Sequence, residues 1–61
     1  MENDPDILLA ARSAIARFGP RAADIMEERA RNHSKSGDKE GEEFWKRVAA
    51  AVREIAKGGT A

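Results

Sequence analysis

The chain has 61 residues, with eleven Lys or Arg and eleven Asp or Glu, so its formal net charge at pH 7 is zero. It contains no Cys and a single His, which excludes disulfides and thiolate zinc sites and leaves too few histidines for a histidine-based metal site. A chain of this length is one domain that hides only about 60% of its unfolded surface, so we expect a homodimer or a protein partner to add stability.

The balanced charge and the composition narrow the class of protein further. Zero net charge lacks the long-range attraction to phosphate that is typical of nucleic-acid binders. The acidic segment Met1 to Asp4 is followed by no apolar run long enough for a signal peptide or a membrane span. We therefore expect one cytoplasmic, non-membrane domain over residues 1–61, with loose ends at 1–3 and 58–61.

The first predicted helix spans residues 5–18. Asp4 suits the N-cap and Pro5 the first helical position. At 100° per residue, six apolar residues form a core-facing stripe: Ile7, Leu8, Ala11, Ala14, Ile15 and Phe18. Leu9 and Ala16 lie outside this stripe, so we expect Leu9 to be exposed or covered by something other than the chain's own core.

The second predicted helix spans residues 20–34 and follows the first at a tight corner. Pro20 loses no helical hydrogen bond at a helix start, and Gly19 permits the sharp change of direction. One side of this helix carries Ala22, Ile25, Met26, Ala30 and His33. Arg29 lies near the middle of that same side.

The third predicted helix spans residues 39–56 and has the clearest apolar pattern. Gly37 suits the left-handed residue that ends the preceding helix, Asp38 suits the next N-cap, and Gly58 marks the stop. The apolar stripe comprises Gly41, Phe44, Trp45, Val48, Ala49, Ala51, Val52 and Ile55. We expect ion pairs on the outer faces between Glu27 and Arg31, Glu42 and Lys46, and Glu43 and Arg47.

Two residues of the third helix lead to specific expectations. Trp45 begins the apolar stripe, so we expect it to be largely buried at the centre of the helix packing. Gly41 costs about 1 kcal/mol relative to Ala inside a helix, so close approach of the second helix at Ala30 or His33 should offset it. Anion binding at this helix start is disfavoured by the acidic residues around it.

Arg29 and His33 form the candidate site, and two interpretations of them are open. One helical turn apart on an apolar face, they could together bind a carboxylate or a phosphate. Alternatively, Arg29 covers the core edge and reaches a carboxylate of the third helix, while His33 is favoured near the helix C-terminus. With Leu9, they are the candidate interaction residues.

No motif in the sequence indicates catalysis. The hydroxyl residues form no recognisable triad, and no glycine-rich loop follows a strand, so we expect no enzyme activity, no cofactor, no metal and no small-molecule substrate. The function that we expect is a protein-interaction or accessory module that self-associates. The alternative is a nucleic-acid-associated regulator with a local basic patch, formed by Arg21, Lys35, Lys46, Arg47 and Arg53.

Three segments resemble a small bacterial helical domain family of uncharacterised function. They are Phe18-Gly19-Pro20, the Glu-Arg-Ala stretch from Glu28 to Ala30, and Gly-Asp-x-Glu-Gly-x-x-x-Trp from Gly37 to Trp45, followed by Val48 and Val52. The resemblance covers most of the chain and consists mainly of caps and core positions. It implies a bacterial cytoplasmic protein and brings no activity or site.

Overall fold

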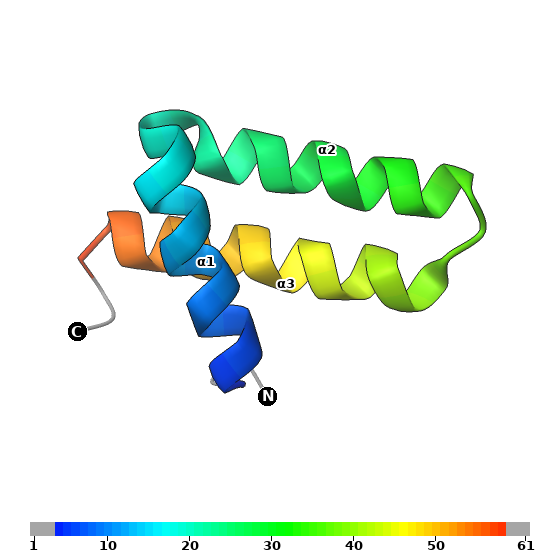
Figure 1. Ribbon diagram of the computed structural model, residues 1–61, viewed down its shortest axis with the longest axis horizontal. Coiled ribbons are helices and arrows are strands. Elements are labelled where there is room, and N and C mark those ends of the chain that lie inside the picture. The colour runs from blue at the N-terminus through cyan, green and yellow to red at the C-terminus, as the bar shows by residue number, and fades with distance from the viewer. Residues whose placement is uncertain (1–3, 59–61) are drawn as a thin grey trace.

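The computed structural model describes residues 4–58, which form three α-helices: α1 (Pro5–Phe18), α2 (Ala22–Lys35) and α3 (Lys39–Ala56). No strand occurs in this part of the chain. α2 and α3 run antiparallel beside each other, and α1 packs across them near the corner that joins it to α2 (Figure 1). The predicted all-α, three-helix fold is therefore confirmed.

Side-chain caps explain why α1 and α3 begin where the sequence predicted. Oδ1 of Asp4 accepts a hydrogen bond from the backbone N–H of Asp6 at 2.9 Å. Oδ1 of Asp38 likewise accepts from the N–H of Gly41 at 2.9 Å. Each carboxylate satisfies an N–H that has no partner inside its helix and lies at the positive end of the helix dipole.

The predicted bounds of the second helix were wrong by a short segment. Gly19–Arg21 form a 3-10 turn, labelled η1, and α2 begins at Ala22 and ends one residue later than expected. The N–H of Ala22 bonds the carbonyl of Gly19, three residues back. Gly19 has φ 61°, so the chain turns sharply first and only then settles into α-helical hydrogen bonding.

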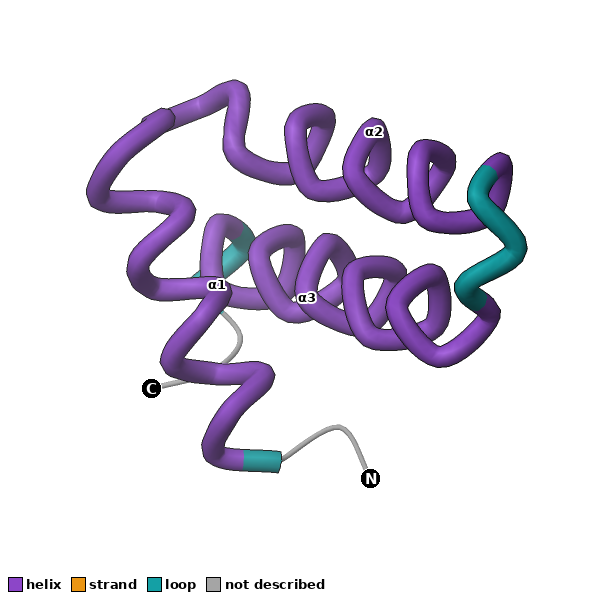
Figure 2. Tube along the Cα trace, turned by 45° about the vertical axis from the view of Figure 1, so that its right-hand side comes forward, coloured by secondary structure: helices purple, strands orange, loops and turns teal. Residues whose placement is uncertain are grey.

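A short turn joins α2 to α3 (Figure 2). Two hydrogen bonds of a Schellman motif close it. The N–H of Asp38 bonds the carbonyl of His33 at 2.8 Å, and the N–H of Gly37 bonds that of Ser34 at 3.0 Å. Gly37 has φ 79°, the left-handed conformation expected at this position. The end of α2 and the start of α3 are thereby held together.

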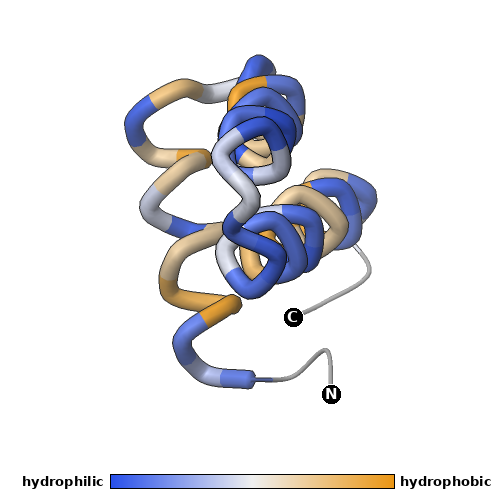
Figure 3. The backbone as a smooth tube through the Cα atoms, turned by 90° about the vertical axis from the view of Figure 1, so that its right-hand side faces the viewer, coloured by the Kyte–Doolittle hydropathy of each residue, from blue (hydrophilic) through white to orange (hydrophobic). Residues whose placement is uncertain are grey.

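The core is built from small and medium-sized apolar side chains contributed by all three helices. Its buried members are Ile7, Ala11, Ala14, Ala22, Met26, Val48, Ala49 and Val52. Four of these are alanines, which allow the helix backbones to approach closely. Most of α2 and α3 is coloured as hydrophilic, and α1 has a hydrophobic stretch near its N-terminal end (Figure 3).

The position of α1 leaves part of the α2 and α3 pair uncovered. α1 crosses the pair on one side, and the half of the pair that ends in the Ser36–Asp38 turn extends beyond it (Figure 1). The expected loose ends at 1–3 and 59–61 lie outside the described residues. Gly58 is exposed and donates its N–H to the carbonyl of Ile55 at 2.9 Å.

Candidate functional site

Trp45 lies at the edge of the core and not at its centre. It packs against the buried cluster but is only partly buried, and the same is true of Phe44. The expectation that Trp45 packs against the core is therefore confirmed, and its expected place at the centre of the helix packing was wrong. The physical reason is the placement of α1, which crosses α3 nearer to its C-terminal end (Figure 1), so that Trp45 lines a hollow beside α1.

Three side chains surround the indole of Trp45. The guanidinium carbon of Arg29 lies 5.3 Å from the ring centroid, within cation–π range. The His33 ring is stacked at a centroid distance of 6.4 Å and an angle of 27°. Phe44 approaches edge-on, with centroids 5.0 Å apart at 84°. The ring is thus held in one orientation although part of it faces solvent.

Arg29 is not paired with a carboxylate, contrary to one of the two interpretations. No Asp or Glu within residues 4–58 forms an ion pair with it. Its guanidinium instead covers the face of Trp45, which leaves the N–H groups at the guanidinium edge able to donate to a ligand. Arg29 and His33 do share one surface, as expected, and Trp45 links them.

His33 is tied to the start of α3 by a contact that the sequence pattern did not reveal. Its Nδ1 lies 2.8 Å from Oδ2 of Asp38. An ionised carboxylate only accepts hydrogen bonds, so Nδ1 carries the shared proton. The hydrogen bond from the N–H of Gly41 lowers the pKa of Asp38 below its ordinary value, and the contact with His33 lowers it further by a smaller amount. His33 is therefore oriented by Asp38 and packs against Trp45.

Gly41 leaves room for this arrangement. A Cβ at this position would overlap the carboxylate of Asp38 and would lie 2.5 Å from Nδ1 of His33. The expected close approach of the second helix is confirmed at His33, since no side chain other than glycine's fits there without displacing the pair.

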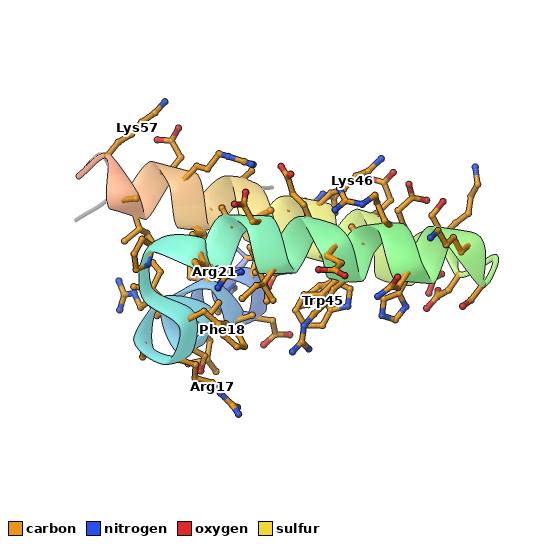
Figure 4. All side chains as sticks on the ribbon, turned by 90° about the horizontal axis from the view of Figure 1, so that it is seen from above. Arg17, Phe18, Arg21, Trp45, Lys46 and Lys57 are labelled. Atoms are coloured by element: carbon orange, nitrogen blue, oxygen red, sulfur yellow. The ribbon has the colours of Figure 1, made fainter. Side chains whose placement is uncertain are left out.

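A shallow hollow of about 180 Å³ opens beside Trp45, between α1 and the pair of α2 and α3. We call it the notch. Its lining residues are Ala10, Ser13, Ala14, Arg17, Phe18, Met26, Arg29 and Trp45. Arg17, Phe18 and Trp45 lie on the α1 side of the molecule, and Lys46 and Lys57 project from the opposite side (Figure 4). Two arginines thus border a largely apolar floor.

Arg17 was not among the candidate residues, because nothing in its local sequence distinguishes it from the other arginines. Its guanidinium carbon lies 6.0 Å from the Phe18 ring centroid, and it too forms no ion pair with a carboxylate in the described part of the chain. Only the crossing of α1 over α2 brings it to the same hollow as Arg29.

Leu9 lies apart from the notch. It is 68% exposed and is the large hydrophobic residue that stands out on the described surface. The expectation that the chain's own core would not cover Leu9 is confirmed. Leu9 does not line the notch, so the three candidate residues divide into two surfaces.

The expected basic patch is only partly assembled, since Lys35 and Lys46 line one hollow and the other three residues do not line it. Arg21 precedes the first residue of α2 and Lys35 is its last residue, so the length of that helix separates them. Lys46 pairs with Glu42 at 3.1 Å, as predicted, and this contact raises the pKa of Lys46. Arg53 pairs with Glu27.

That last contact corrects one of the expected ion pairs. Glu27 reaches across to α3 instead of pairing with Arg31 along α2. Glu43 and Arg47 do not come within ion-pair distance. A neighbouring helix can offer a closer partner than the same helix does, which spacing along the sequence cannot reveal.

Among residues 4–58, no three His, Cys, Asp or Glu side chains are grouped so that they could hold a metal ion. None of the helices described is both long enough and apolar enough to cross a lipid bilayer. In comparisons with known proteins, no family model matches the chain, and neither the curated proteins nor the solved structures give a significant match. The resemblance to a bacterial helical family stays a prediction.

Proposed function

We propose that this chain is a small protein-interaction module and that the notch is its binding surface. The observation that carries the proposal is the partly exposed Trp45, held between Arg29 and His33 beside a hollow. Trp and Arg are the residue types that most often dominate binding energy at protein interfaces, especially next to a pocket. Because packing already fixes the indole, little rotational entropy is lost on binding.

The test is a display selection of random peptides on the immobilised protein. We expect binders that lose affinity for Arg29→Ala and keep it for Arg31→Ala. Arg31 is the matched control, because it is an exposed arginine two residues further along α2 that lines a different hollow. Selected peptides that bind both variants equally would contradict the notch as the binding surface.

A second candidate function is self-association, which the 68% exposure of Leu9 favours. An apolar hollow of about 550 Å³, lined by residues that include Ile15, Ile55 and Ala56, lies between the first and third helices. A homodimer through α1 and this flank of α3 would cover apolar surface that one copy leaves in water. Its interface does not include the notch.

Sedimentation velocity over a wide concentration range tests the dimer. We expect a mass that rises toward that of two chains, and a melting temperature that rises with protein concentration. Leu9→Glu should lower the association without loss of helix content, and Arg12→Glu on the same exposed face of α1 is the control for added negative charge. A monomer at every concentration would rule out self-association.

The nucleic-acid alternative gains less support. Two of the five basic residues on which it depends are engaged by Glu42 and Glu27. A salt titration with a short DNA duplex distinguishes it, because phosphate contacts weaken steeply with salt and an apolar interface does not.

A further inference from the structure

The charge of the notch distinguishes it from three other hollows on the described surface. The hollow between α2 and α3 is lined in part by Glu27 and Glu42, and the hollow near the start of α1 by Asp4, Glu40 and Glu43. The apolar hollow between α1 and α3, described above with Ile15 and Ile55, contains one cation, Arg53, which Glu27 neutralises. Among these four, only the notch is lined by two cations that form no ion pair in the described part of the chain, and no carboxylate lines it.

Resting on the function proposed above, we infer that the notch binds an acidic peptide segment of a partner protein, in which an apolar side chain lies next to a carboxylate. The apolar side chain enters the hollow between Phe18, Met26 and Trp45. The carboxylate accepts hydrogen bonds from the guanidinium of Arg29, or of Arg17 on the opposite rim.

The size of the notch fits one side chain. A cavity of about 150 Å³ accommodates benzene, and the notch has a volume of about 180 Å³. It therefore takes a single branched aliphatic or aromatic side chain. Because one side chain fills the notch, the rest of the partner lies across its rim.

The arginines on the rim are prepared for a carboxylate by the aromatic rings below them. The guanidinium carbon of Arg29 lies 5.3 Å from the Trp45 ring centroid and that of Arg17 lies 6.0 Å from the Phe18 centroid, so attraction to the rings favours these positions of both side chains. A stacked guanidinium keeps its edge N–H groups free for in-plane, bidentate contacts. On α2, Asp24 and Glu28 lie 100° or more around the helix from Arg29, at 100° per residue.

The occupant is expected to be acidic because a basic or neutral segment would leave these cations without a counterion next to an apolar anchor. Charge complementarity of this kind raises association rates and excludes partners with the wrong sign. It also makes binding sensitive to salt, since the rim charges are exposed.

The experiment starts from the peptides selected on the native chain. We expect their shared motif to combine a large apolar residue with a neighbouring Asp or Glu. One such peptide is then synthesised together with its amide counterpart, in which each Asp becomes Asn and each Glu becomes Gln. Fluorescence anisotropy should show that the amide peptide binds about tenfold or more weakly, equivalent to about 1.4 kcal/mol.

Variants of the two arginines show which guanidinium binds the peptide carboxylate. Arg29→Ala should weaken binding of the acidic peptide by a similar factor. It should hardly change binding of the amide peptide, because that peptide already lacks the carboxylate with which Arg29 interacts. Arg17→Ala should act in the same direction, and Arg31→Ala should have no effect. Circular dichroism and Trp45 fluorescence verify that each variant keeps the fold.

Each outcome separates this inference from the function on which it rests. Selected peptides that are neutral or basic but still depend on Arg29 would overturn the acidic motif and leave the interaction module standing. If no peptide is enriched, or if none depends on the notch, both the proposed binding function of the notch and the acidic motif are refuted. If the native chain forms a dimer that Arg29→Ala dissociates, a second copy is the occupant and an external acidic partner is ruled out.

Discussion

The replacement of Gly41 by Ala gives the sharpest test of how the turn between α2 and α3 is held. Ala is better than Gly inside a helix by about 0.5–1 kcal/mol, so the substitution would stabilise α3 if nothing else changed. The structure opposes this gain. The added Cβ would overlap the carboxylate of Asp38 and lie 2.5 Å from Nδ1 of His33, well inside the usual contact distance of about 3.5–4.0 Å.

Both side chains therefore have to turn away, and the cap of α3 is lost. Helix N-caps are generally worth about 0.5–2 kcal/mol, and exposed ion pairs add up to about 1 kcal/mol. These losses exceed the gain in helix propensity, so we expect Gly41→Ala to lower the free energy of unfolding by about 1 kcal/mol. For a domain of this size the melting temperature should fall by about 4–8 °C.

The same substitution should have the opposite sign in an Asp38→Ala background. With the carboxylate removed, His33 is free to turn and only the propensity of Ala remains, so Gly41→Ala should then stabilise by about 0.5–1 kcal/mol. Urea denaturation followed by far-UV circular dichroism measures all four proteins of the cycle. An equal effect of Gly41→Ala in both backgrounds would refute the reasoning.

Three further predictions follow from the same surface and its neighbours. Trp45→Ala should cost about 2–3 kcal/mol, below the roughly 3–5 kcal/mol of a fully buried aromatic residue, and a thermal melt within a few degrees of the parent would contradict this. Asp38→Asn keeps a capping side chain but removes the ionisable carboxylate. The pKa of Asp38 is lowered below 3.8, so the ionised carboxylate stabilises the fold above about pH 3.8. That stabilisation is lost as the pH falls through the lowered pKa. Urea midpoints of the two proteins should therefore converge in acid, and a gap that stays constant would count against this. Glu27→Ala should cost only about 0.2–1 kcal/mol, because its contact with Arg53 is exposed; a double-mutant cycle with Arg53→Ala measures that coupling.

Features that depend on neighbouring residues could be predicted from the sequence. Asp4 and Asp38 cap their helices because a short acidic side chain reaches an N–H two or three residues further on, whatever the rest of the fold does. Gly37 takes the left-handed conformation for an equally local reason. Spacing at 3.6 residues per turn likewise identified most of the buried positions, although Leu8, which it placed in the core-facing stripe, is not among the core residues.

Only the tertiary structure decided what covers each part of those faces. Periodicity gives the angle of a residue around its helix axis, and by that measure Trp45 and Val48 lie about 60° apart on the same apolar face. They differ in burial because α1 crosses the pair of helices at one place (Figure 1): Val48 is fully buried within the core of the three helices, and Trp45 lies at its edge. That crossing also brings Arg17 to Arg29, two residues on different helices, and so creates the notch.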